Sequence, residues 1–171
     1  MARREETEAE RLRRIAILNN RLPKKRNIAQ GLLRNPAGEV LLCELTYKQE
    51  WDLPGGVVDP GEPPARTVVR EVDEELGIDV ATAGLIAVNW LPPWRGWDDA
   101  HLFLFDLGVH SGELDPARFL RREIVDAHWV DPSAVGDHVA PYTARMLASV
   151  AAWTPGETLY LEDGTAPGGA A

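Results

Sequence analysis

The segment "GGVVDPGEPPARTVVREVDEELGI", residues 55–78, contains the pattern that decides the fold. Pro63 and Pro64 suit the first turn of a helix, and Gly77 suits the position just after its last turn. The sequence therefore predicts a helix over residues 63–76. On a helical wheel its apolar residues fall on one narrow stripe: Ala65, Val68, Val69, Val72 and Leu76. A helix with such a stripe packs on a hydrophobic core.

Three glutamates lie along the edge of that stripe. Glu71, Glu74 and Glu75 are spaced by three and four residues and so share a face, whereas Asp73 points to the other side. Their mutual repulsion costs roughly 0.2–0.5 kcal/mol per pair, and Arg70, one turn earlier, is a local partner for Glu74 alone. This face is either a solvated acidic surface or a site for hard divalent cations, which prefer carboxylate oxygens. The helical spacing by itself leaves both interpretations open.

The residues ahead of the helix extend the pattern. Nine defined positions within residues 56–78 resemble the Nudix box: Gly56, Glu62, Arg70, Glu71, Val72, Glu74, Glu75, Gly77 and Ile78. The chain is thereby similar to the Nudix hydrolase family. This resemblance implies an α/β fold, a Nudix-type α/β/α sandwich with a mixed β-sheet.

The resemblance also implies a chemistry. Members of the family hydrolyse nucleoside diphosphates linked to another moiety, cutting a pyrophosphate bond with bound Mg2+ or Mn2+. By motif position, the implied metal ligands are the carboxylates of Glu71, Glu74 and Glu75 and the carbonyl of Gly56. Glu62 and Arg70 are implied as a charged pair that supports the loop on the helix. A polyanionic substrate can approach such an acidic site because the cations reverse its local charge.

The general base of the reaction is left open between two residues. Glu71 is the candidate within the box. Glu123 lies six residues before Trp129, a position that resembles the downstream metal-binding glutamate of some family members, so it is a candidate for both catalysis and metal binding. Glu123 can equally be an exposed acidic residue of a loop, without a functional role. Asp98 and Asp99 are lesser candidates.

Aromatic and basic residues predict where a nucleotide binds. The loop "NWLPPWRGWDD" supplies Trp94 and Trp97, which can stack on a base, and Arg95, which can contact a phosphate. Trp51 is a similar candidate; each tryptophan can instead stiffen its loop. Pro93 lies fifteen residues after Ile78, which resembles members that cleave ADP-ribose. ADP-ribose or a nucleotide sugar is therefore expected slightly ahead of a nucleoside triphosphate.

Two other functions fit the same resemblance. A Nudix module without catalysis can sense a nucleotide, although it does not need the full set of carboxylates. An isomerase acting on an allylic diphosphate needs a catalytic cysteine, and Cys43 in "VLLCEL" has no evident acidic partner. The sequence favours the hydrolase.

The chain divides by composition into three regions. Residues 1–26 form a charged helical extension with nine Arg and Lys against four Glu, residues 27–155 form the Nudix hydrolase domain, and residues 156–171 are expected to be a flexible tail. After residue 26 the chain has nine basic and twenty-three acidic residues, which argues against general nucleic-acid binding. The helix expected at residues 3–20 packs on the domain or on a second subunit, which suggests a homodimer. One cysteine and no membrane segment indicate a cytoplasmic protein without a membrane partner.

The remaining apolar segments complete one mixed α/β domain. Five of them are predicted as strands: residues 28–34, 39–45, 84–91, 100–107 and 124–130. A second helix is predicted near residues 141–153. Turn-forming residues such as "NPAG" at 35–38 separate the elements.

Overall fold

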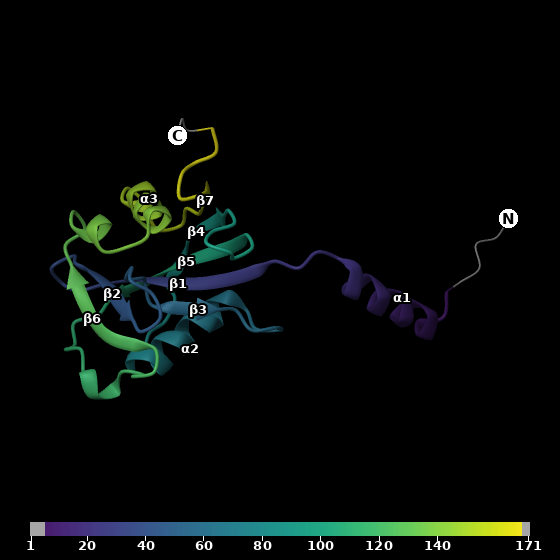
Figure 1. The fold of residues 1–171 in the computed structure, drawn as a ribbon, viewed down its shortest axis with the longest axis horizontal. Helices are drawn as coiled ribbons and strands as arrows, with labels where there is room; N and C mark the ends of the chain where they lie inside the picture. Colours follow the sequence, from purple (N-terminus) through teal and green to yellow (C-terminus); the bar gives the residue numbers. More distant parts are fainter. Residues whose placement is uncertain (1–5, 169–171) are drawn as a thin grey trace.

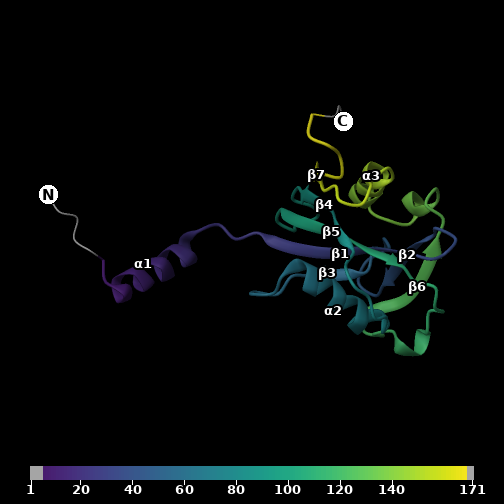
Figure 2. The same ribbon diagram turned by 180° about the vertical axis from the view of Figure 1, so that it is seen from behind.

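A mixed sheet of seven strands lies between two helices in the computed structural model, which describes residues 6–168 (Figure 1). The strands are β1 (Arg26–Arg34), β2 (Val40–Leu45), β3 (Gly55–Val57), β4 (Gly84–Leu91), β5 (Ala100–Val109), β6 (Ile124–Val130) and β7 (Leu159–Glu162). The helices are α1 (Glu8–Arg21), α2 (Pro64–Leu76) and α3 (Pro141–Val150), with short 3-10 turns η1 (Pro116–Arg118) and η2 (Val135–Asp137). Helix α2 covers one face of the sheet and α3 covers the other (Figures 1 and 2). This is the α/β/α sandwich that the resemblance implied.

The strand order places Gly56, the first residue of the Nudix box, beside the middle of the sheet. The sheet runs β6-β2-β1-β5-β4-β7, and β3 pairs with β1 outside this path. Strand β1 is parallel to β5 and β4 is parallel to β7, while the other pairs are antiparallel. Within the β1–β3 pair, Ala29 lies opposite Gly56. The short strand β3 is therefore fixed beside the central strand.

Consecutive residues of the central strands point to opposite faces of the sheet, as the pleat requires. In β2, Leu41 and Cys43 belong to the hydrophobic cluster under α2, whereas Leu42 belongs to the cluster under α3. The cluster under α3 includes Met146 and Val150 of that helix. The stripe predicted for α2 is confirmed, because all its members are buried or partly buried in the other cluster: Ala65, Val68, Val69, Val72 and Leu76.

Most of the predicted elements are confirmed. The strands expected at residues 84–91 and 124–130 are β4 and β6. Helix α2 begins one residue later than expected, because Pro63 has the extended backbone of an N-cap residue (φ −71°, ψ 138°). The sequence does not predict β3, because Gly55 and Gly56 have no side chains whose polarity could alternate.

The expectation of a flexible tail over residues 156–171 is wrong for its first part. Leu159–Glu162 form β7, which pairs with β4. Leu161 is 2% exposed and belongs to the cluster under α3. The strand has four residues and is flanked by glycine-containing turns, so the sequence pattern is too short to predict it. Residues 169–171 lie outside the described part of the chain.

Helix α1 extends away from the sandwich. It begins after Thr7, whose hydroxyl accepts a hydrogen bond from Glu10 N at 3.3 Å, while the Glu10 carboxylate accepts one from Thr7 N at 3.0 Å. None of its residues is buried, and it stands apart from the body (Figures 1 and 2). The expected helix at residues 3–20 thus forms from residue 8, with residues 1–5 outside the description, and it does not pack on the domain. Within residues 6–168, no helix is long and apolar enough to cross a membrane.

The packing of β7 predicts that alanine substitutions at two neighbouring residues change the free energy of unfolding by different amounts. We expect Leu161→Ala to lower the free energy of unfolding by about 2–4 kcal/mol, because it leaves a cavity in the core. Tyr160→Ala, at a position that is 53% exposed, should change it by less than about 0.5 kcal/mol. Urea unfolding followed by circular dichroism measures both values. Equal stability of the two variants would show that β7 does not belong to the folded unit.

Candidate active site

Gly56 and Glu71 come into close contact where β3 lies against α2. A side chain at position 56 would displace the Glu71 carboxylate, because a Cβ atom there would lie 2.7 Å from Glu71 Cδ. The helix then ends at Gly77, whose φ of 66° is a left-handed conformation that glycine adopts without strain. The two glycines of the box therefore permit the close approach of the β3 backbone and the termination of the helix.

Arg70 connects three carboxylates of the box. Its guanidinium donates two hydrogen bonds to Glu62, with Nε–Oε1 and Nη2–Oε2 distances of 3.0 Å. Its Nη1 lies 3.0 Å from both Glu71 Oε1 and Glu74 Oε2. Hydrogen bonds from Arg70 and, second, from Thr67 lower the pKa of Glu62 to about 2. The pairing of Glu62 with Arg70 is present as predicted, but Arg70 also contacts Glu71, which the sequence reasoning left without a local partner.

Glu75 is the buried member of the acidic group. It is 4% exposed, and the Gly55 N–H donates a hydrogen bond to its Oε2 at 3.3 Å. Burial raises the pKa of Glu75 to about 8; the negative charges of Glu71 and Glu123 add to this rise, and the Gly55 N–H opposes it. A carboxyl group in this environment is mostly protonated at neutral pH unless a nearby cation compensates its charge.

Glu123 joins this group from the turn that precedes β6. It lines the same cavity as Glu71 and Glu75. Burial is the main cause that raises the pKa of Glu71, and the charge of Glu123 contributes. Glu74 differs, because its side chain is 53% exposed and does not line the cavity. The structure thus gathers Glu71, Glu75, Glu123 and Gly56 at one cavity and leaves Glu74 outside its lining.

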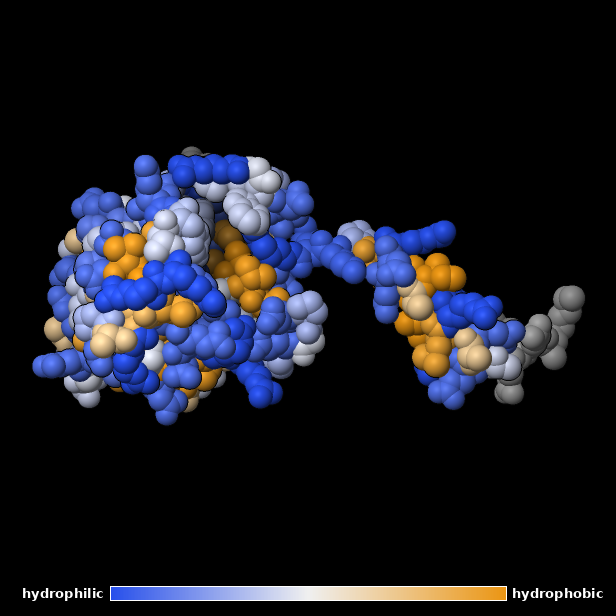
Figure 3. Space-filling model, turned by 60° about the horizontal axis from the view of Figure 1, so that its bottom comes forward, coloured by the Kyte–Doolittle hydropathy of each residue, from blue (hydrophilic) through white to orange (hydrophobic). Residues whose placement is uncertain are grey.

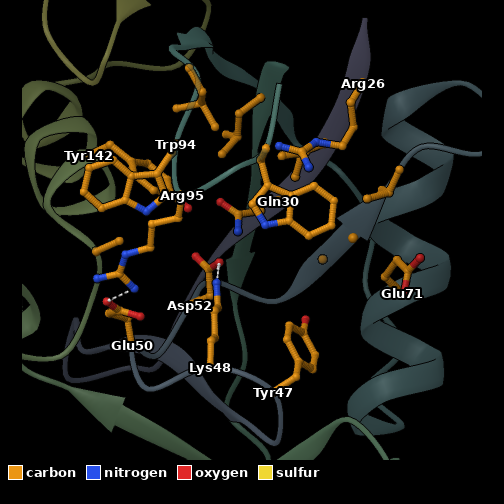
Figure 4. Close-up of a pocket in the computed structure, with 18 of the residues that line it drawn as sticks. Arg26, Gln30, Tyr47, Lys48, Glu50, Asp52, Glu71, Trp94, Arg95 and Tyr142 are labelled. Atoms are coloured by element: carbon orange, nitrogen blue, oxygen red, sulfur yellow. Dashed lines mark hydrogen bonds and ion pairs between the residues drawn. The ribbon is translucent and has the colours of Figure 1, made fainter. Parts of the chain in front are cut away.

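The cavity has a volume of about 630 Å³, within the range of small-molecule sites. Figure 4 shows Glu71 on the α2 side and Trp94, Arg95 and Tyr142 on the opposite side. The Arg95 guanidinium forms an ion pair with Glu50, with an Nη1–Oε1 distance of 3.0 Å. The site therefore has an acidic side and an aromatic and basic side.

Trp94 and Trp97 lie at the two ends of a tight hairpin turn. Trp94 N donates to Trp97 O at 3.0 Å and Trp97 N donates to Trp94 O at 2.9 Å. The two residues between them, Arg95 and Gly96, have φ values of 47° and 88°, as such a two-residue turn requires. Both tryptophans line the cavity and are exposed, and Arg26 lies 4.6 Å above the ring of Trp97. The hairpin presents flat aromatic surfaces on which a planar ligand can stack.

Trp51 does not join them. Its ring is stacked between the rings of His128 and His138, with centroid distances of 4.2 Å on each side. It packs against the cluster under α3 and does not line the cavity. For Trp51 the geometry therefore supports a role in holding its loop, which the sequence analysis gave as the alternative to substrate binding.

Sequence reasoning missed several residues that line the cavity: Arg26, Gln30, Tyr47, Lys48, Asp52 and Tyr142. Lys48 forms an ion pair with the buried Asp52 (Figure 4). Gln30 on β1 is 4% exposed, and within the described chain its Oε1 has no hydrogen-bond partner. One signal was available, because the loop "TYKQEWD" before β3 combines charged and aromatic residues. Arg26, Gln30 and Tyr142 instead lie on a strand and a helix, and only the fold shows that these positions line the cavity.

Cys43 is not placed for catalysis. It is buried in β2 within the cluster under α2. Burial raises the pKa of its thiol well above the ordinary range, and the charges of Glu75 and Asp52 add to this. The thiolate needed for nucleophilic chemistry is therefore disfavoured.

The donor atoms at the acidic side suit a hard divalent cation. Carboxylate and carbonyl oxygens are the ligands that Mg2+ and Mn2+ prefer, and the buried Glu75 carboxyl needs a compensating charge to ionise. Among the described residues, no three or more His, Cys, Asp or Glu side chains already form a cluster that could hold a metal ion. The donors therefore fit such an ion in kind, and their side chains would turn toward it on binding.

Comparisons with known proteins agree with this geometry. The sequence model of the NUDIX domain matches residues 24–152. A Bacillus subtilis (strain 168) protein, provisionally named 8-oxo-dGTP diphosphatase, is 30% identical over 116 residues, which are 68% of this chain and 73% of that protein. An RNA pyrophosphohydrolase of Erythrobacter litoralis (strain HTCC2594) is 25% identical over 144 residues, 73% of this chain and 87% of that protein.

Solved structures give the same fold. The MutT protein from Methanosarcina mazei Go1 superposes with a TM-score of 0.65 at 24% identity, covering 77% of this chain and 97% of that one. The Nudix pattern, the sandwich and the family match thus identify the same domain. The chain belongs to the Nudix hydrolase family and is a hydrolase of the pyrophosphohydrolase kind.

Proposed function

We propose that this Nudix hydrolase cleaves the pyrophosphate bond of a nucleoside diphosphate linked to a second moiety. ADP-ribose or a nucleotide sugar is slightly favoured over a nucleoside triphosphate. One observation carries the proposal: a single cavity has glutamates on its α2 side and Trp94 with Arg95 on the opposite side (Figure 4). Trp97 and Arg26 also line it. A substrate with a base at one end and a diphosphate in its middle can contact both sides at once.

The acidic side holds the cation in this proposal. Its ligands are the carboxylates of Glu71, Glu75 and Glu123 and the carbonyl of Gly56, with Glu74 joining when its carboxylate leaves Arg70. When bound, Mg2+ or Mn2+ supplies positive charge that polarises a phosphoryl oxygen and acidifies a bound water. Glu62 and Arg70 keep α2 and the preceding loop in place, because their paired hydrogen bonds fix both side chains.

The other side positions the substrate. Trp94 and Trp97 are proposed to stack on the base, and Arg95 is proposed to contact a phosphate or the second moiety. Arg26 also lines the cavity, and within the described residues its Nε has no hydrogen-bond partner. A free donor at that point can bind an anionic or hydroxylated group of the ligand.

Two residues remain candidates for the base that accepts a proton from the attacking water. Glu71 is partly buried, and burial raises its pKa, which makes it a stronger proton acceptor than an ordinary glutamate. Its carboxylate is also 3.0 Å from Arg70 Nη1, which opposes that role. Glu123 is paired with Arg122 at the surface, with an Nε–Oε1 distance of 2.9 Å. Single substitutions Glu71→Gln and Glu123→Gln distinguish the two candidates. The substitution that removes the base should lower kcat and also abolish the acidic limb of the pH–rate profile.

A nucleoside triphosphate is the second candidate substrate. It is favoured by the name of the Bacillus subtilis relative, an 8-oxo-dGTP diphosphatase given provisionally. The same cavity can hold its base on the tryptophan hairpin. A nucleotide-sensing module without catalysis is the alternative to both, and the complete set of box carboxylates argues against it.

The first prediction concerns hydrolysis. With Mg2+, the parent should release product from at least one member of a panel of ADP-ribose, nucleotide sugars, nucleoside triphosphates including 8-oxo-dGTP, and dinucleoside polyphosphates. Glu75→Gln should lower kcat by more than about 100-fold, because it removes a charged ligand of the cation. Asp73→Asn is the matched control on the exposed side of the same helix and should keep parental activity.

Two results would contradict this assignment. Full activity of Glu75→Gln would show that this carboxylate does not support the cation. Tight nucleotide binding by a parent that hydrolyses nothing in the panel would favour the sensor.

The second prediction concerns stability against pH in the metal-free protein. The folded pKa of Glu75 is about 8 against an ordinary value of 4.5, so the folded state favours the protonated form. This contribution to stability is complete below pH 4.5 and is lost as the pH rises through 8. Glu75→Gln imitates the protonated form. It should equal the parent at pH 4.5 or below and exceed it by roughly 2–4 kcal/mol near pH 8.

Urea unfolding in EDTA measures this difference, with Asp73→Asn as the control that should follow the parent at every pH. If Glu75→Gln were no more stable than the parent at the higher pH, the carboxyl would not be buried as described.

The third prediction concerns the tryptophan hairpin. Trp97→Ala should raise KM about tenfold with kcat changed less than about twofold, because base stacking contributes roughly 1–3 kcal/mol of binding. Trp97→Phe keeps a flat ring and should stay within about threefold of the parental KM. Steady-state kinetics on the best substrate of the panel gives these values. An unchanged KM in the alanine variant would place the base elsewhere.

A further inference from the structure

Helix α1 stands apart from the sandwich and packs on none of the other helices and strands described in residues 6–168. It has fourteen residues and a capping box, yet none of its residues is buried. An isolated helix of this length is marginal in water, and most helices in proteins are stabilised by packing an apolar face. Something outside the described body must therefore cover part of α1 for it to be stable.

One side of α1 carries an apolar stripe suited to such packing. Advancing about 100° per residue places Leu12, Ile15, Leu18 and Leu22, the residue after the helix, on one side. Leu12 is 54% exposed, Leu18 43% and Leu22 58%. Figure 3 shows apolar side chains gathered on the projecting helix. Ile17 is equally exposed, at 49%, but the same rotation places it on the opposite side.

The charges along α1 are separated by sign. The acidic residues Glu6, Glu8 and Glu10 lie at its beginning, and the basic residues Arg11, Arg13, Arg14 and Arg21 lie from its second turn to its end, followed by Lys24 and Lys25. Arg3 and Arg4, earlier in the sequence, lie outside the described residues. An exposed ion pair joins Arg14 to Glu6, just before the helix, at 2.8 Å, and such a pair contributes little to stability. Two copies side by side in the same direction would place like charges together. In opposite directions, the acidic end of each would face the basic end of the other.

We propose that α1 is a dimerisation helix that pairs antiparallel with α1 of a second copy of this chain. The pairing buries the stripe of Leu12, Ile15, Leu18 and Leu22 and brings opposite charges together at both ends. A membrane surface fits less well, because the helix has three acids at its start and no aromatic residue. The cavity is complete within one chain, so hydrolysis does not depend on the pairing and the two claims fail separately.

The pairing is tested first by sedimentation of the full-length protein over a series of concentrations. The parent should sediment as a dimer, and a double variant, Leu12→Asp with Leu18→Asp, should sediment as a monomer with unchanged kcat and KM. Ile17→Asp is the control, because it introduces the same residue on the opposite side of the helix and should stay dimeric. A monomeric parent would overturn the proposal, and so would equal loss of dimer in the control.

Engineered cysteines test the direction of the pair. Ala16 lies near the centre of α1 and Ala9 one heptad earlier on the same edge of the stripe. In an antiparallel pair, Ala16→Cys meets its copy and should form an interchain disulfide under mild oxidation. The two Ala9→Cys sites would be separated by about 21 Å along the axis and should stay reduced. The native Cys43 is buried and provides little background.

Two further results would contradict the assignment. Crosslinking of Ala9→Cys as readily as Ala16→Cys would indicate a parallel pair. Binding of a monomeric parent to vesicles of anionic phospholipid, abolished by the Leu12 and Leu18 changes, would show that the stripe is a membrane-binding face.

Discussion

Burial of the Glu75 carboxyl against β3 is the constraint on which the rest of the site depends. The helix buries this residue because it lies at the edge of the stripe formed by Val68, Val72 and Leu76. Within residues 6–168, the hydrogen bond that its carboxyl accepts comes from the backbone N–H of Gly55 at 3.3 Å. Burying an ionised carboxylate without a cation is unfavourable. Near neutral pH the metal-free protein therefore holds Glu75 mostly in its protonated form, and binding of a divalent cation would supply the missing charge.

The surrounding architecture explains why this arrangement persists. Arg70 compensates Glu62, Glu71 and Glu74 together, so this part of the acidic group is stable without an added ion. Gly56 leaves no side chain between β3 and the helix. The protein thus pairs Glu62, Glu71 and Glu74 with Arg70 and leaves the most buried carboxyl of the cavity, Glu75, without a cationic partner among the described residues. The opposite wall is built from loops and strand ends that carry tryptophan, arginine and lysine.

Sequence patterns predicted the elements that have a clear period and missed those that do not. The stripe of α2 and the strands β4 and β6 follow from regular spacing, whereas β3 has two glycines and β7 has four residues between turns. The acidic side of the site could be predicted because its residues lie close together in one segment. Trp94, Arg95 and Trp97 could be predicted for the same reason, since one loop carries them. The rest of the lining could not, because Gln30, Lys48 and Tyr142 come from three distant segments that only the fold brings together. Trp51 shows the same limit, since its stacking partners come from β6 and from the segment before α3.

Titration calorimetry of Mg2+ or Mn2+ into the protein near pH 7, repeated in buffers of different ionisation enthalpy, tests the central claim most directly. If the cation supplies the charge that lets Glu75 ionise, binding should release roughly one proton, and Glu75→Gln should release almost none. The buffer dependence of the binding enthalpy gives that number. Cation binding without proton release, or no binding even with a nucleotide present, would contradict the account.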